Sequence, residues 1–281
     1  MTLLEFLDLS VDRPASDKRG LAVESAVRAE ESGYQRLWIA EHHGRAAPCG
    51  SPLPVAAALG AMALRLRIGT AVTLLRLRDP YLTALDIAQA SHFCSGGFDV
   101  GLGRGDVRGP AEGAVAHLRK DDEQLAADLD ALAAMLREGG EALPPLAGNW
   151  QLWLHGSATT SAELAAKLGA NYCHALFFNP DIEQCRAAFR RYRELGGQGA
   201  TAIAVAFAAG QPGKTTDEDA TRRWGVRVSM LPDADMCART ALRALAISGA
   251  QELVIAELSP DPAQHLDRIT EIRSSLLKQA G

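Results

Sequence analysis

Two glycine-rich segments have the residue types that bind a phosphate group. The first runs Gly101-Leu-Gly-Arg-Gly-Asp106. Bare glycines let the backbone approach an anion, and the Arg104 guanidinium matches two phosphate oxygens at once. Asp106 stands where the third glycine of a dinucleotide-binding fingerprint would be, so a tight turn after a strand is the alternative reading.

The second segment runs from Gly156 to Ser161 and is rich in serine and threonine. It precedes a predicted helix, where unpaired backbone N–H groups and the helix dipole favour an anion. Ser157 and Ser161 would add hydroxyl groups, although capping the helix is the commoner use of such residues. Together with Arg104 and Gly105, this segment predicts a phosphate site.

Histidines near these segments could transfer protons to a ligand held by its phosphate. Adjacent His42 and His43 point to opposite sides of an extended chain, so they cannot share one metal ion, and packing or surface roles are the alternative. The small Ala71-Val72 segment would form a floor under a flat heterocycle. His155 is either a second functional histidine or a core residue.

Short apolar runs separated by longer helical patterns and Gly/Pro turns indicate alternating strands and helices. The eight predicted strands are Leu3–Leu9, Arg36–Ala40, Arg67–Thr73, Phe98–Leu102, Gln151–Leu154, Tyr172–Phe177, Thr201–Phe207 and Glu252–Ala256. The predicted helices are Leu21–Ser32, Pro54–Leu64, Pro80–Phe93, Leu118–Arg137, Ser161–Leu168, Asp181–Leu195, Thr216–Arg223, Ala234–Ser248 and Pro262–Lys278. Asp12–Arg19 is expected to be a loop.

Eight strand–helix units predict a single (β/α)8 TIM barrel over residues 1–281. A doubly wound open sheet is the main competitor, but the glycine fingerprint it usually has after its first strand is missing from Ser10–Pro14. In a barrel the carboxyl ends of the strands gather at one rim. The segments after the second to fifth strands would therefore meet there.

Composition limits the classes of protein that remain. The chain has 281 residues, 47% of them hydrophobic, and a net charge of −5. These values exclude a disordered chain and do not favour nucleic acid as a partner. We expect no membrane segment and no signal peptide. Five scattered cysteines indicate buried neutral thiols in a reducing, cytoplasmic setting, without a zinc or other metal site.

Four motifs, in this order, resemble the bacterial-luciferase-like flavin monooxygenases. They are Gly33-Tyr-Gln-Arg-Leu-Trp-Ile-Ala-Glu-His-His43, Arg67-Ile-Gly-Thr-Ala-Val72, Phe98-Asp-Val-Gly-Leu-Gly-Arg-Gly105, and Leu152-Trp-Leu-His-Gly-Ser157 followed by Ala165-Ala-Lys-Leu-Gly169. The resemblance covers essentially the whole chain. It implies a TIM barrel that binds reduced FMN from a separate reductase and uses O2 to oxidise a small organic substrate, for example in natural-product biosynthesis.

The resemblance also assigns residues. His42 is similar to the family's active-site histidine, and Ala71-Val72 matches a non-proline cis peptide beneath the flavin ring. Arg104 and Gly105 match one half of the phosphate site, and Gly156, Ser157 and Ser161 match the other. Leu176 and Phe177 would line the ring pocket.

Two connections are shorter than in longer members of that family, namely Gly105–Leu143 after the fourth strand and Trp224–Pro232 after the seventh. A homodimer through the apolar helix at Leu53–Leu64 is also expected from the resemblance. Two alternatives remain for the function: an oxidoreductase of the same fold that uses deazaflavin F420, and a flavin-binding protein without turnover.

Overall fold

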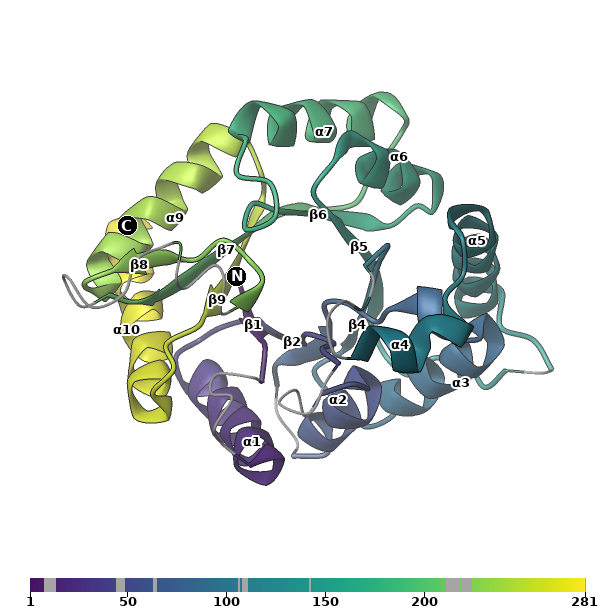
Figure 1. Cartoon of the computed structure of the whole chain (residues 1–281), viewed down its shortest axis with the longest axis horizontal. Helices are drawn as coiled ribbons and strands as arrows, with labels where there is room; N and C mark the ends of the chain where they lie inside the picture. The colour runs from purple at the N-terminus through teal and green to yellow at the C-terminus, as the bar shows by residue number, and fades with distance from the viewer. Residues whose placement is uncertain are drawn as a thin grey trace.

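The computed structural model describes residues 1–7, 14–43, 49–62, 65–105, 107, 111–141, 143–210, 218 and 224–280. Eight parallel strands close into a barrel with helices around it (Figure 1). The barrel strands are β1 Thr2–Glu5, β2 Arg36–Ile39, β3 Arg67–Thr70, β4 Phe98–Gly103, β5 Trp150–Gly156, β6 Asn171–Ala175, β7 Thr201–Ala209 and β9 Glu252–Glu257. This arrangement confirms the predicted TIM barrel.

The helices follow the strands in the expected alternation. Their bounds are α1 Ala15–Glu31, α2 Pro52–Gly60, α3 Pro80–Ser91, α4 Glu112–Val115, α5 Asp122–Glu138, α6 Thr159–Lys167, α7 Ile182–Glu194, α9 Ala234–Ser248 and α10 Pro262–Ala280. Two short 3-10 turns are η1 Leu75–Leu77 and η3 Ala116–Leu118. The helix predicted over Thr216–Arg223 lies, apart from Glu218, outside the described residues. No helix in the described ranges is long and apolar enough to cross a membrane.

Several boundaries differ from the prediction. Helix α1 begins at Ala15, directly after Pro14, so most of the loop predicted over Asp12–Arg19 is its polar first turn. Helix α5 begins only at Asp122, because Asp121 and Gln124 form a capping box there. The first strand ends at Glu5, ahead of Leu7, whose positive φ of 64° is incompatible with an extended strand.

An additional strand, β8 Ser229–Leu231, was not predicted. It pairs in parallel with the last three residues of β7, beyond the eight strands of the closed barrel. Three residues are too few to produce a periodic pattern in the sequence.

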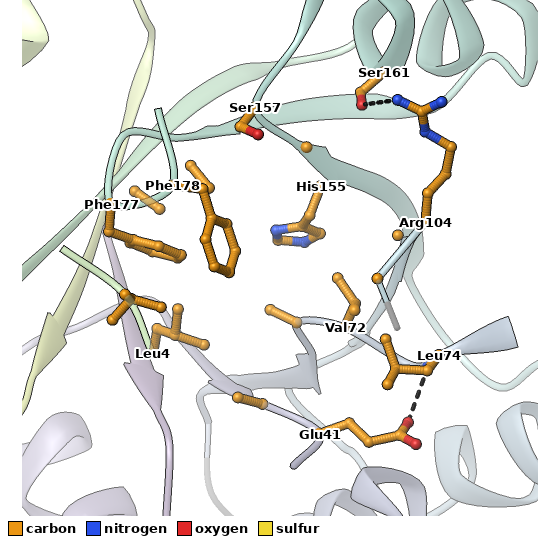
Figure 2. A pocket seen from close by; sticks show the side chains of 18 of the residues that line it. Leu4, Glu41, Val72, Leu74, Arg104, His155, Ser157, Ser161, Phe177 and Phe178 are labelled. Atoms are coloured by element: carbon orange, nitrogen blue, oxygen red, sulfur yellow. Dashed lines mark hydrogen bonds between the residues drawn. The ribbon is translucent and has the colours of Figure 1, made fainter. Parts of the chain in front are cut away.

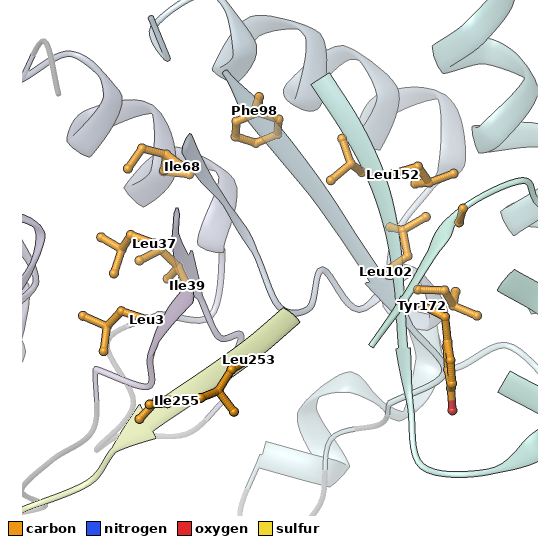
Figure 3. Packing of buried hydrophobic residues seen from close by; sticks show 14 of the residues in the cluster. Leu3, Leu37, Ile39, Ile68, Phe98, Leu102, Leu152, Tyr172, Leu253 and Ile255 are labelled. Carbon is orange, nitrogen blue, oxygen red and sulfur yellow. The ribbon is translucent and has the colours of Figure 1, made fainter. Parts of the chain in front are cut away.

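Alternation along the strands divides the core into two layers. The outward-facing side chains pack against the helices (Figure 3), and the labelled examples Leu37, Phe98 and Ile255 come from β2, β4 and β9. The inward-facing side chains fill the barrel, where the Trp38 and Trp153 rings meet edge to face at 5.0 Å. The five cysteines are buried thiols, as predicted.

Charged groups close the amino-terminal end of the barrel interior. Asp99 accepts hydrogen bonds from Arg36 at 3.0 Å and from the Trp38 indole at 2.9 Å, and it pairs with Arg67 at 2.6 Å. The opposite end of the interior, at the carboxyl ends of the strands, holds a cavity instead.

Candidate functional site

A cavity of about 370 Å³ opens at the carboxyl ends of the barrel strands. Nine of the ten residues predicted for the site line it: His42, Ala71, Val72, Arg104, Gly105, Gly156, Ser157, Ser161 and Phe177. These residues come from five different strand ends, so closure of the barrel brings them together.

Leu176 does not line this cavity, contrary to the prediction. It is buried in the outer layer against the helices, whereas Phe177 belongs to the inner layer. Strand β6 ends at Ala175 and the chain turns there, with the Phe178 amide donating to the Ala175 carbonyl oxygen at 3.1 Å. In this turn Phe177 and Phe178 line the cavity, and Leu176 packs outside it.

One end of the cavity is cationic and rich in hydroxyl groups. The Arg104 Nη2 atom donates to Thr160 Oγ1 at 2.8 Å and to Ser161 Oγ at 3.4 Å. Helix α6 begins at this point with Ala158 as its N-cap, and no side chain caps its first turn. Its amide groups are therefore not occupied by a serine or threonine cap, which favours the phosphate reading of this segment.

Two glycines allow neighbouring segments to pack closely at the Arg104 end of the cavity. A methyl group at Gly156 would overlap the Ser161 side chain, and one at Gly103 would lie 3.1 Å from Val72 Cγ1. Gly156 thus lets the first turn of α6 lie against β5, and Gly103 lets the segment after β3 lie close to β4.

The peptide bond between Ala71 and Val72 is cis, as the resemblance implied. Both residues lie just after β3, and Val72 faces the cavity (Figure 2). The next segment is held in place by Glu41, whose Oε2 atom accepts a hydrogen bond from the Leu74 amide at 2.9 Å.

Glu41 is a positioning residue that belongs to the first of the four sequence motifs and for which no role was predicted. Its side chain is fully buried, and its Oε1 atom also accepts from Arg78 at 2.9 Å and lies 2.7 Å from His43 Nε2. His43 is thereby turned toward Glu41, whereas His42 lines the cavity. The two histidines face different groups, as predicted for neighbours on an extended segment.

The His42 ring lies against Phe6, with ring centroids 4.9 Å apart. Its Nδ1 atom is 3.2 Å from the Phe6 carbonyl oxygen. A carbonyl oxygen only accepts hydrogen bonds, so Nδ1 carries a proton, and Nε2 is the nitrogen that can gain or lose one. An imidazole held in one tautomer can accept a proton at the second nitrogen.

The end of the cavity away from Arg104 is apolar. Phe177 and Phe178 meet edge to face at 4.9 Å, and Leu4 lies next to them (Figure 2). Phe178 was not predicted to line the cavity, although it extends the apolar run Leu176-Phe177 by one residue. His155 lies between the two ends. The described residues contain no cluster of three or more histidine, cysteine, aspartate or glutamate side chains that could hold a metal ion.

The sequence has recognisable relatives. The chain is 26% identical over 246 residues to the N-acetyl-S-alkylcysteine monooxygenase of Bacillus subtilis (strain 168), covering 81% of this chain and 74% of that protein. It is 27% identical over 194 residues to a luciferase-like monooxygenase of Escherichia coli (strain K12), covering 64% of this chain and 56% of that protein. The chain thus spans between about half and three quarters of these relatives.

Solved structures share the fold over nearly the whole chain. Apo-MsnO8 superposes with a TM-score of 0.82 at 20% identity, covering 99% of this chain and 98% of that one. The oxygenating constituent of 3,6-diketocamphane monooxygenase from Pseudomonas putida, in complex with FMN, gives 0.74 at 14% identity, with coverage of 99% and 98%. An F420-dependent secondary alcohol dehydrogenase with an F420-acetone adduct gives 0.76 at 15% identity, with 98% of each chain covered.

A family model described as luciferase-like monooxygenase matches residues 8–252, which is most of the chain. The match agrees with the closed parallel barrel and with the order of the four sequence motifs. The chain therefore belongs to the luciferase-like monooxygenase family.

Proposed function

We propose that this protein is a monooxygenase that uses reduced FMN, supplied by a separate reductase, and O2 to oxidise a small organic substrate. The observation that carries the proposal is the Arg104 side chain, hydrogen-bonded to hydroxyl groups at the start of α6, at one end of a cavity whose wall includes Ala71 and Val72. A phosphate group and a flat ring on one molecule match these two features.

The residues of the cavity fit FMN. Arg104, Ser157 and Ser161 offer donors to the phosphate, and Gly105 and Gly156 keep the backbone open around it. Ala71, Val72 and Phe177 offer apolar contact to the ring. When bound, the reduced flavin supplies the electrons that activate O2.

Within this proposal the protein's own groups do three things. Arg104 anchors the cofactor, and His42 accepts or returns a proton at Nε2 during the O2-dependent reaction. The apolar side chains at the other end of the cavity exclude water and select an uncharged substrate with apolar surface. The side chains that form this end are Leu4, Phe6, Phe177, Phe178 and Val226.

An anaerobic titration of the purified protein with reduced FMN and, separately, with reduced F420 tests the proposal. We expect tight binding of reduced FMN, weaker binding of F420, and O2-dependent reoxidation of the bound FMN. Preferential binding of F420 would instead support hydride transfer by an oxidoreductase of the same fold. Binding of FMN with no reaction toward O2 would support a flavin-binding protein without turnover.

Arg104→Ala separates specific binding from non-specific binding in the same titration. Loss of a charge-assisted contact to phosphate is expected to raise the Kd for reduced FMN at least about ten-fold, since such contacts contribute roughly 1.5–3 kcal/mol. Arg186→Ala on the exposed face of α7 is the matched control and should leave binding unchanged. Equal Kd values for the wild type and Arg104→Ala would show that the phosphate assignment is wrong.

We also propose a homodimer that uses the surface around α2. Five of the nine residues of α2 are buried by the chain itself, so its apolar character is partly explained by the fold. Exposed apolar side chains nevertheless remain on α3 and just beyond the ends of α2 and α3, namely Leu82, Met62 and Phe93. A monomer in light scattering at tens of micromolar protein would contradict this proposal.

A further inference from the structure

His155 occupies the middle of the cavity and has no role in the function proposed above. It is the sixth residue of β5 and lies in register with Gly103 of β4. Its ring meets the buried Trp38 ring edge to face at 4.9 Å. Figure 2 shows the imidazole between the Phe178 ring on one side and Val72 on the other.

The two nitrogens of this ring have different surroundings. The Nε2 atom is sealed from solvent and has no hydrogen-bond partner among the described residues. The ring itself lines the cavity, and its Nδ1 atom, unlike Nε2, is not sealed from solvent. A ligand in the cavity can therefore reach Nδ1 and cannot reach Nε2.

The charge state and the position of the proton follow from this burial. Removal of the ring from water lowers the pKa of His155 to about 3, so the imidazole is neutral at pH 7. A neutral imidazole has one N–H group. Buried N–H donors without a partner are rarer in proteins than buried acceptors without one. The sealed Nε2 atom is therefore the acceptor nitrogen, and the hydrogen of the neutral ring is on Nδ1.

We propose that His155 is a cofactor-contact residue whose Nδ1–H group donates a hydrogen bond to the heterocycle that packs on Ala71 and Val72. The inference rests on the flavin-binding function proposed above. Val72 and the His155 ring line the same cavity and lie next to each other in Figure 2. A ring that contacts Val72 is thus next to His155.

The positions of the acceptor atoms in the heterocycle determine which part of it would accept this hydrogen bond. In a flavin the acceptor atoms belong to the pyrimidine ring and the central nitrogen, whereas the dimethylbenzene ring has none. The donor would therefore orient the pyrimidine half toward β5. Reduced flavin concentrates negative charge on that half, so the hydrogen bond should strengthen binding of the reduced form more than of the oxidised form.

The alternative role for His155 is to fill space above Trp38. Two substitutions distinguish the roles. His155→Phe keeps a ring of similar size against Trp38 but has no N–H group, and His155→Asn loses most of the ring but keeps a donor close to the position of Nδ1. The exposed His92 at the end of α3 supplies a matched control, His92→Phe.

The first measurement uses the protein without ligand. Nitrogen-15 NMR of labelled histidine should show the His155 signals, assigned by their loss in His155→Asn, as a neutral ring with the proton on Nδ1 at pH 6. An imidazolium at that pH, or a proton on Nε2, would overturn the inference whatever cofactor the protein binds.

The second measurement is an anaerobic titration of each folded variant with reduced and with oxidised FMN. We expect His155→Phe to raise the Kd for reduced FMN by about ten-fold and to change the Kd for oxidised FMN less, since one hydrogen bond to a charged group has this effect. His155→Asn should recover most of the loss, and His92→Phe should match the wild type.

The possible failures are distinct. If the wild type binds reduced FMN and His155→Phe binds it equally well, His155 only packs, and the proposed function stands without this inference. If the wild type binds no reduced FMN, the proposed function and the inference both fail. A loss in His155→Phe that is equal for reduced and oxidised FMN would overturn the preference for the reduced form.

Discussion

At the scale of single residues, His42 is the side chain whose geometry fits proton transfer best. The contact of Nδ1 with the Phe6 carbonyl oxygen fixes the tautomer, and the ring lines the cavity. His155 also lines the cavity, but its pKa of about 3 keeps it from accepting a proton near neutral pH. The two histidines of one cavity are therefore suited to different tasks, proton transfer for His42 and donation of a hydrogen bond for His155.

The role of His42 predicts a defect in turnover rather than in binding. His42→Ala should slow O2-dependent reoxidation of bound reduced FMN by about 100-fold or more, the usual contribution of a positioned general acid or base. The Kd for reduced FMN should change little, because Arg104 and the α6 amides remain. Stopped-flow absorbance after mixing with oxygenated buffer measures the rate, and His92→Ala is the control. Reoxidation at the wild-type rate would exclude His42 from the step.

At the scale of elements, the site depends on how closely β5 approaches the first turn of α6. Ser161 is buried in that turn, with its side chain against Gly156. The helix is thereby brought close enough to the strand for Arg104, from the neighbouring β4 end, to contact Thr160 and Ser161.

The same packing predicts that Gly156→Ala destabilises the protein. A methyl group there must displace Ser161, and such overpacking typically costs about 1–3 kcal/mol. Gly20→Ala is the matched control, because Gly20 lies in α1 with no atom within 4 Å of an added methyl group. That substitution should stabilise the protein by roughly 0.5–1 kcal/mol, as is usual inside a helix. Urea unfolding checks both, and equal unfolding free energies would contradict the packing argument.

At the scale of the whole molecule, a buried charged cluster joins the first and last strands of the barrel. His265 of α10 lies between two carboxylates, with Nδ1 2.7 Å from Glu257 Oε2 and Nε2 3.1 Å from Glu5 Oε2. Burial alone would lower the pKa of His265, but the two carboxylates outweigh it and raise this pKa to about 10. Residues 5 and 265, at opposite ends of the chain, are thereby bound together where the barrel closes.

This cluster predicts that stability decreases at alkaline pH. An unfolded histidine loses its proton near pH 6.5, whereas folded His265 keeps it up to about pH 10. The folded state therefore holds one extra proton between these values. The unfolding free energy should fall with rising pH there, by up to about 1.4 kcal/mol per pH unit. Below pH 6.5 the contribution of His265 to the unfolding free energy is fully present.

Urea unfolding of the wild type and His265→Gln between pH 6.5 and 9.5 measures this effect. The variant should be less stable at pH 6.5 and should lack the additional slope, because glutamine does not titrate. His92→Gln at an exposed position should keep the wild-type slope. The same slope in the wild type and in His265→Gln would mean that other groups cause the pH dependence.

The order of the elements and nine of the cavity-lining residues could be predicted from the amino-acid sequence. The eight barrel strands could be predicted because their signals are local: each is a short apolar run bounded by glycine, proline or polar turn residues. The family motifs placed the cis peptide correctly at Ala71-Val72. They also selected Arg104 and Ser161, which are far apart in sequence and 3.4 Å apart in the fold.

The tertiary structure alone sets the contacts that depend on closure of the barrel. It placed Phe177 and not Leu176 at the cavity, gave Glu41 its role in holding Leu74, and brought His265 between Glu5 and Glu257. It also left His155 with one nitrogen sealed and the other toward the cavity. Each of these outcomes is a contact between distant segments, and local propensity carries no information about which segments will meet.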